Sequence, residues 1–231
     1  MPFSRQLPMI CTPDPNELTA AMVSIGMNFA AEPSQNAPIE ETLVLASRSG
    51  MEDGDLRVLS ILATWMARHH QHVNVDRLVR CISRESSTRV RAWWAAVAHW
   101  LRKDRRFSRV EKLYDGPPVD LLPVGTEFQI GRKGEDSRFS ASVLRVPNGT
   151  LRDREADVLS PHEMVKRHAG YRNRVRFGPG WRADVWTVLE HNPSGSVAEV
   201  ARQTGCAFAT AWEVAQDYEL LHGTDSTVTS S

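Results

Sequence analysis

The 231-residue sequence has few cysteines and no long apolar run. Its three cysteines are odd in number and lie far apart, at Cys11, Cys81 and Cys206. This excludes a disulfide framework and favours a reducing compartment. No apolar run reaches the ~18 residues of a membrane-spanning helix, and residues 1–15 lack the basic stretch and apolar core of a secretory signal. We therefore expect a cytoplasmic protein that has no membrane partner.

An excess of charge of either sign is also missing, because 28 basic side chains balance 28 acidic ones. This balance excludes a uniformly basic nucleic-acid binder. The charge is nevertheless segregated: the net charge is −5 over residues 1–58, +8 over 59–112, −3 over 113–129, +5 over 130–179 and −5 over 180–231. The two basic segments are either solvated faces or surfaces for a polyanion or an acidic partner.

Motifs for enzyme chemistry are scarce. The sequence contains neither a phosphate-binding glycine loop nor a Gly-x-Ser-x-Gly elbow. His69, His70 and His72 close a predicted helix with only Asp76 at ligand spacing, whereas a metal site needs several convergent ligands. We therefore expect no catalytic residue, no metal site and no cofactor.

One alternative for enzyme chemistry stays open in the middle of the chain. Asp120 and Glu127, followed by Gln129 and Lys133, resemble part of a metal-dependent nuclease core. The usual acidic-x-Lys element is broken, because Gln129 stands at the lysine position. A nuclease is therefore the weakest of the functions that we consider.

The first fifty residues predict a helical arm. A helix begins at Asp14-Pro15, where proline is tolerated, and Leu18 and Met22 lie at helical spacing along it. A second helix is predicted over residues 39–49, with Gly50 as its C-terminal stop.

Residues 51–118 predict a winged-helix-like domain. Three helices are expected: one over residues 55–70, one that begins at about residue 75, and one over residues 88–102. Residues 72–75 are either a small strand or, with Asn74, the cap of the second helix. Residues 105–114 alternate like a strand, and residues 115–118 predict a turn. Three helices followed by a β-hairpin are typical of a winged helix-turn-helix.

Residues 119–179 predict a β-rich connecting region. Strands are expected over 127–130 and 140–146, a turn over 147–150, and a helix that begins with the capping box Ser160 and Glu163. Residues 180–231 predict three more helices and a disordered polar tail from residue 224. The predicted fold class is thus mainly α with small β, with two winged-helix-like tri-helical units joined by an irregular β-rich segment.

The last triplet contains a helix-turn-helix motif. Ala201 stands where a small residue lets two helices touch, Gly205 stands at the tight turn, and Cys206 follows as an apolar residue. These residues resemble the helix-turn-helix of bacterial DNA-binding proteins. The outward positions of its second helix are acidic, however, and no arginine or lysine follows Arg202. We therefore expect protein contact here, through Trp212, Glu213 and Gln216, unless Trp212 lies in the core.

The first triplet is basic where a recognition helix would begin. Serine, threonine and arginine side chains at such a position bind phosphates and guanine edges. Basic residues follow near the expected wing, although solvated faces explain the same pattern. The predicted DNA-binding residues are Ser87, Thr88, Arg89, Arg91, Arg102, Lys103, Arg105, Arg106 and Arg109.

The two tri-helical units and their charges resemble the helix-turn-helix antitoxins of bacterial abortive-infection modules. This resemblance implies a non-enzymatic transcriptional regulator that binds the operator of its own operon, also holds a protein toxin and forms homo-oligomers. The main alternative is a protein-interaction adaptor without DNA binding.

Overall fold

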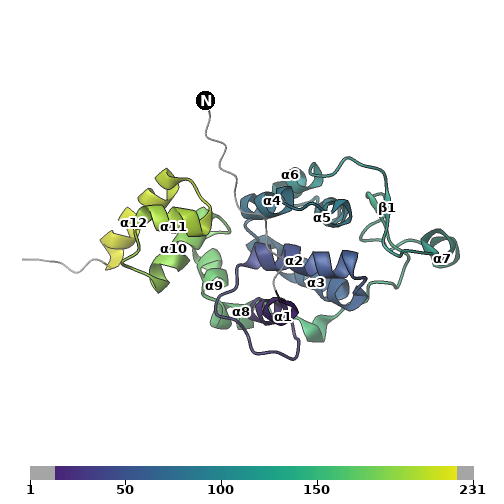
Figure 1. Ribbon diagram of the computed structural model, residues 1–231, viewed down its shortest axis with the longest axis horizontal. Coiled ribbons are helices and arrows are strands. Elements are labelled where there is room, and N and C mark those ends of the chain that lie inside the picture. Colours follow the sequence, from purple (N-terminus) through teal and green to yellow (C-terminus); the bar gives the residue numbers. More distant parts are fainter. Residues whose placement is uncertain (1–13, 223–231) are drawn as a thin grey trace, which may run out of the picture. The chain divides into compact units, whose positions relative to one another are not determined.

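The computed structural model describes residues 14–222, and it is mainly helical (Figure 1). Its one sheet is a parallel pair, in which β1 (Val119–Asp120) joins β2 (Leu144–Arg145). The predicted class, mainly α with small β, is confirmed. None of the helices within residues 14–222 is long and apolar enough to cross a bilayer.

The chain forms two compact units, one up to His168 and one from Ala169. The predicted arm, winged-helix-like region and most of the connecting region lie in the first unit. Cys11 and the tail predicted from residue 224 lie outside the described residues. The helices of the first unit are α1 (Pro15–Ser24), α2 (Ile39–Glu52), α3 (Leu56–His69), α4 (Val75–Ser83), α5 (Thr88–Trp100), α6 (Ser108–Glu111), α7 (Thr126–Lys133) and α8 (Pro161–Arg167), with 3-10 turns η1 (His70–His72), η2 (Arg105–Phe107) and η3 (Glu155–Asp157).

Helix starts in the first unit follow the predicted caps. The side chains of Asp14, Asp55 and Asn74 each accept a hydrogen bond from a backbone amide in the first turn of their helix. Asn74 therefore caps a helix, and the alternative strand at residues 72–75 does not form. The capping box of Ser160 and Glu163 is also present at the start of α8.

Helix α2 is the central element of the first unit, because α1, α3, α4 and α5 all pack against it (Figure 1). The predicted stop at Gly50 is wrong, since the helix continues to Glu52. A Cβ atom on Gly50 would lie 2.4 Å from two side-chain carbons of Leu59 in α3. Gly50 therefore allows two helices to cross closely and does not end one.

Helix α5 is a core helix. Residues 92–98 are buried on every side, and none of them is more than 2% exposed. The indole of Trp94 donates to the hydroxyl of Ser47 in α2 at 2.9 Å, and Trp93 packs on Phe139 with ring centroids 5.5 Å apart. A helix that is apolar all round belongs in an interior and leaves no long face for a partner.

The predicted wing strand over residues 105–114 is wrong. The segment forms η2 and α6, because Phe107 and Val110, three residues apart, are both fully buried. Asp104 accepts a hydrogen bond from the Arg106 amide and so starts the turn. The partial alternation in this stretch therefore reflects helical spacing.

The middle of the chain is less β-rich than predicted. Residues 127–130 lie in α7, and of the strand expected over 140–146 only Leu144–Arg145 forms. The turn at residues 147–150 is confirmed: the Thr150 amide donates to the Pro147 carbonyl, and Gly149 has a φ of 76°. Two-residue strands are too short to show a period of two in sequence.

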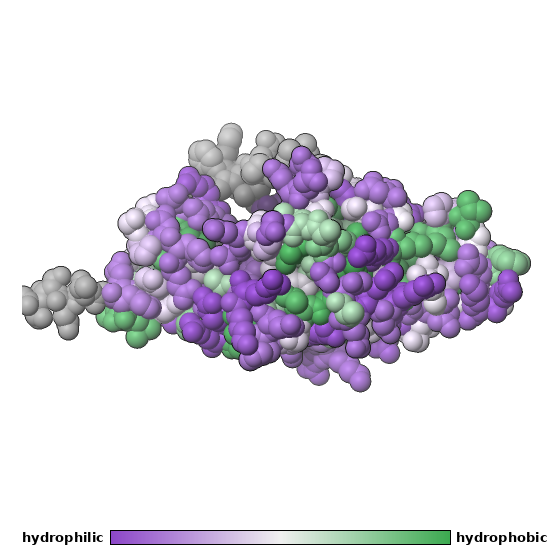
Figure 2. Space-filling model, turned by 90° about the horizontal axis from the view of Figure 1, so that it is seen from below, coloured by the Kyte–Doolittle hydropathy of each residue, from purple (hydrophilic) through white to green (hydrophobic). Residues whose placement is uncertain are grey.

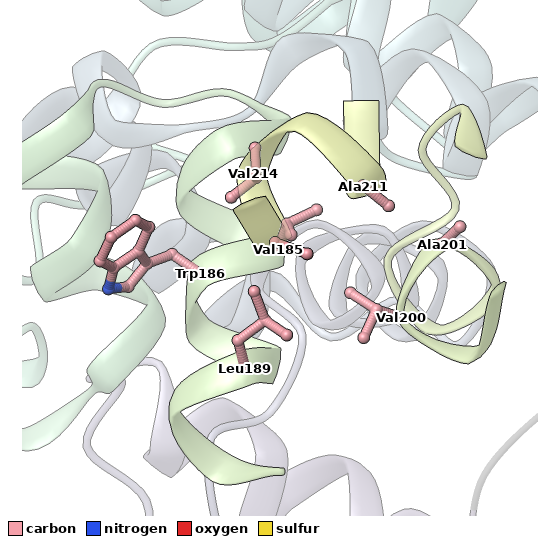
Figure 3. Close-up of a cluster of buried hydrophobic side chains, with 8 residues drawn as sticks. Val185, Trp186, Leu189, Val200, Ala201, Ala211 and Val214 are labelled. Atoms are coloured by element: carbon pink, nitrogen blue, oxygen red, sulfur yellow. The ribbon is translucent and has the colours of Figure 1, made fainter. Parts of the chain in front are cut away.

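The second unit consists of α9 (Ala169–Phe177), α10 (Trp181–His191), α11 (Val197–Thr204) and α12 (Phe208–His222). Helices α10, α11 and α12 pack on one another in all three pairs. Gly205 ends α11 in the left-handed conformation, with a φ of 78°, as the motif requires. Their common core, drawn in Figure 3, comprises Val185, Trp186, Leu189, Val200, Ala201, Ala211, Val214 and Ala215.

Candidate functional site

The N-terminus of α5, the predicted recognition site, is tied into the fold. The Ser87 side chain accepts a hydrogen bond from the Val90 amide at 3.2 Å and bonds Glu52, while Thr88 is exposed. The Arg89 guanidinium donates to the carbonyls of Met51 and Leu121, at 3.1 and 3.2 Å. Arg89 therefore holds the end of α2 and the segment after β1 against α5.

Arg91 has a similar internal role. Its Nε and Nη2 atoms donate to the Glu85 carbonyl at 2.8 and 2.5 Å. The Glu85 carboxylate is buried and forms an ion pair with Arg48 at 2.8 Å. We expected the guanidinium groups of Arg89 and Arg91 to project toward DNA. They instead donate to backbone carbonyls of the first unit, at the start of a helix whose middle is buried.

A cleft of about 530 Å³ opens beside this helix end, and it is lined by carboxylates as well as guanidinium groups. Arg48 in its wall already pairs with Glu85, and Arg89 already binds two carbonyls. Glu52 adds a further negative group. Carboxylates in the wall oppose a phosphate, so this cleft does not suit a nucleic-acid backbone.

The basic residues after α5 divide into two groups. Arg106 is bound by the Asp104 carboxylate at 2.6 Å, and its guanidinium lowers the pKa of that carboxyl. Arg109 pairs with Asp76 on the surface, although its side chain is still 62% exposed. The other residues of the predicted DNA-binding set in this stretch are solvent-exposed, and they are Arg102, Lys103 and Arg105.

Of the two carboxylates that suggested a nuclease, Asp120 is held in an ion pair. Both Asp120 oxygens accept from Arg145, at 2.6 and 3.0 Å, across the β1–β2 pair. Glu127 lies in the first turn of α7 and is exposed. Within residues 14–222, no three histidine, cysteine or acidic side chains are grouped to hold an ion.

The predicted helix-end histidines have structural contacts. His69 is buried, and its Nε2 donates to the Leu159 carbonyl at 2.9 Å. Burial lowers the pKa of His69 to about 4. His69 is therefore neutral at pH 7 and fastens α3 to the segment before α8.

Helix α12 combines a buried inner face with an exposed apolar outer face. Ala211, Val214 and Ala215 are at most 4% exposed, whereas Trp212 is 51% exposed. Glu213 and Gln216 are also exposed, as predicted. The alternative that Trp212 lies in the core is therefore wrong.

Two apolar residues of this face were not expected there. Phe208 is 58% exposed and Leu220 is 83% exposed, and neither was among the residues predicted to face outward. Successive steps of four residues separate Phe208, Trp212, Gln216 and Leu220, so these side chains follow one side of the helix. The spacing of four residues on either side of Trp212 is the sequence signal that would have indicated both Phe208 and Leu220.

The outer face is also acidic. Within the described residues, Glu213 has no ion-pair partner, and Glu219 contacts only the Gln216 amide, at 3.5 Å. Asp217 at its edge pairs with Arg182 at 2.7 Å. We call Phe208, Trp212, Glu213, Gln216, Glu219 and Leu220 the α12 surface.

Comparisons of this chain with family models, with curated proteins and with solved structures find no match.

Proposed function

We propose that the protein is a non-enzymatic interaction adaptor whose second unit binds a partner protein through the α12 surface. The observation that carries this proposal is the exposure of Phe208, Trp212 and Leu220 on one side of a well-packed helix. Large aromatic side chains are enriched in protein interfaces and dominate their binding energy. An apolar surface of this kind is costly to leave in water.

The charge of the α12 surface selects the partner. Glu213 and Glu219 flank the apolar side chains and have no cation beside them in the described part of the chain. They would repel nucleic-acid phosphates, although the sequence of α11 and α12 resembles a helix-turn-helix. The surface fits a protein that presents basic residues around an apolar patch.

The experiment is a comparison of captured proteins from cells that express the gene naturally. Tagged wild-type protein, Trp212→Ala, Glu213→Lys and the control Gln203→Ala, which changes an exposed residue of α11, are purified in parallel. We expect one protein, with basic residues on its binding surface, that wild type and Gln203→Ala retain. After purification it should bind Trp212→Ala and Glu213→Lys about tenfold or more weakly. Equal binding of all four proteins would refute the proposal.

DNA binding by the first unit is a second candidate, because Arg102, Lys103 and Arg105 are exposed close together after α5. In this arrangement the first unit would bind the operator of its own operon, and the α12 surface would hold a toxin, as in an antitoxin. Replacing the three residues with alanine should reduce the salt slope of promoter binding by about one per lost phosphate contact. An unchanged slope, or no binding by wild type, would dismiss this candidate.

A further inference from the structure

A second exposed apolar surface lies on α7. Among the described residues of the first unit, the large hydrophobic side chains that are strongly exposed are Val124 at 86% and Phe128 at 73%. Arg132 and Lys133 follow them at the end of the helix. We call Val124, Phe128, Arg132 and Lys133 the α7 surface.

The start of helix α7 is fixed by a local hydrogen bond, and its outer side chains are exposed. Buried Thr126 donates through its hydroxyl to the Leu122 carbonyl at 3.2 Å. Gly125 and Gly134, with φ of 81° and 79°, bound the helix at its two ends. Figure 1 shows α7 standing apart from the other helices of its unit, and Figure 2 shows hydrophobic residues at that end.

Phe128 and Arg132 lie on one side of α7. They are four residues apart within the helix, whereas exposed Val124 stands just before the left-handed Gly125 at the helix start. Gly131 lies beside them, and no atom lies within 4 Å of where its Cβ would be. This absence of a side chain leaves room for a partner helix to approach next to Phe128.

The α7 and α12 surfaces are complementary. Arg132 and Lys133 form no ion pair within residues 14–222, and neither does Glu213. One surface thus offers an exposed phenylalanine with unpaired cations, and the other an exposed tryptophan with unpaired carboxylates. Opposite charges around matched apolar patches fix the register of an interface and exclude other partners.

We propose that the α7 surface of one copy of this chain docks on the α12 surface of a second copy. This inference rests on the proposed function of the α12 surface and names its partner. Each chain carries both halves of the contact, and the contact is heterologous, because the two halves differ. Repetition therefore generates a closed ring or an open filament.

The heterologous contact makes a mixing experiment decisive. Wild-type protein should show concentration-dependent association in sedimentation velocity at tens of micromolar. Phe128→Ala and Trp212→Ala should each sediment as monomers. An equal mixture of the two variants should form dimers and nothing larger, because only one intact contact is possible between them. Val175→Ala, which truncates an exposed valine of α9, is the matched control and should associate like wild type.

A charge exchange tests the register. Arg132→Glu alone and the double change Glu213→Arg, Glu219→Arg alone should each abolish association. One chain that carries all three substitutions should associate again, because every contact in it pairs the exchanged charges. Wild-type protein that stays monomeric, a mixture that fails to dimerise, or a cross-link between residues 128 and 212 within one monomer would overturn the inference. If wild type is monomeric but another protein binds in a Trp212-dependent way, the inference fails and the proposed function stands. Association that is insensitive to Trp212→Ala also overturns the inference, and it contradicts the proposed function as well if no other protein binds in a Trp212-dependent way.

Discussion

Arg174 and Asp184 form an ion pair inside the second unit. The Nε and Nη2 atoms of Arg174 lie 3.0 and 2.8 Å from the Oδ1 of Asp184, and the two side chains are only 2% and 5% exposed. The pair joins α9 to α10, so α9 belongs to the same packed body as the three helices that follow it.

Because a lone buried charge is costly, Arg174→Ala should lower the unfolding free energy by about 3–5 kcal/mol. Arg172 lies on the same helix as Arg174, is partly exposed and pairs with Glu190 on α10. Arg172→Ala should therefore lower the unfolding free energy by less than about 1 kcal/mol. Urea unfolding of the full chain, followed by tryptophan fluorescence, compares the two variants. Equal losses would show that burial does not govern this pair.

Arg89 and Arg91 should matter for stability. Each guanidinium satisfies backbone carbonyls that tie segments of the first unit together. We expect Arg89→Ala and Arg91→Ala each to lower the unfolding free energy by about 1–2 kcal/mol. Thr88→Ala, an exposed neighbour, should change it by less than about 0.5 kcal/mol. Thermal unfolding followed by circular dichroism compares the stability of the three variants. If both arginine variants are as stable as wild type but bind DNA more weakly, the structural role of these arginines is contradicted.

Gly50 and Gly131, which lie within α2 and α7, predict opposite effects. Gly50→Ala should destabilise the first unit by about 1–3 kcal/mol, because its methyl group would overlap Leu59. Gly131→Ala meets no neighbour in α7 and should stabilise the chain by about 0.5–1 kcal/mol. Chemical denaturation measures both changes. A Gly50→Ala protein as stable as wild type would refute the close crossing of α2 and α3.

The stability of the first unit should depend on pH through His69. Its pKa is about 4 in the folded chain and 6.5 in the reference state, so the unfolded chain binds the proton first as the pH falls. Stability is therefore full above about pH 6.5 and declines down to about pH 4, by up to about 3 kcal/mol. His69→Gln keeps a donor for Leu159 and should flatten this slope.

The control for the pH prediction is His162→Gln, at an exposed position of α8. This variant should keep the wild-type dependence of the unfolding free energy on pH. A His69→Gln protein with an unchanged slope between pH 6.5 and 4 would show that another group causes it.

Local signals in the sequence predicted much of the fold. Asn74 as a cap, the capping box of Ser160 and Glu163, and Gly205 at a tight turn depend on neighbouring residues only, and the structure has each of them. The role of Gly50 could not be predicted from its neighbours in sequence, because a glycine is needed there to make room for Leu59 on another helix. The burial of α5 likewise follows from tertiary packing around α2.

The candidate site was predicted in part. The acidic residues beside Trp212 indicated an outward surface, whereas Phe208 and Leu220 were missed because apolar residues are ordinarily placed inward. The arginines near position 90 suggested DNA contact. Their hydrogen bonds to the carbonyls of Met51, Glu85 and Leu121 depend on tertiary structure, which the sequence does not show.

The central claim is that the α12 surface is a protein-binding surface, and site-specific photo-crosslinking tests it most directly. A photoreactive phenylalanine analogue is placed at Gln216, within the surface, or at Gln203, exposed on α11, in cells that express the protein naturally. The account predicts a discrete protein adduct from position 216 that Trp212→Ala abolishes, and none from position 203. The same adducts from both positions, or none from 216, would contradict it.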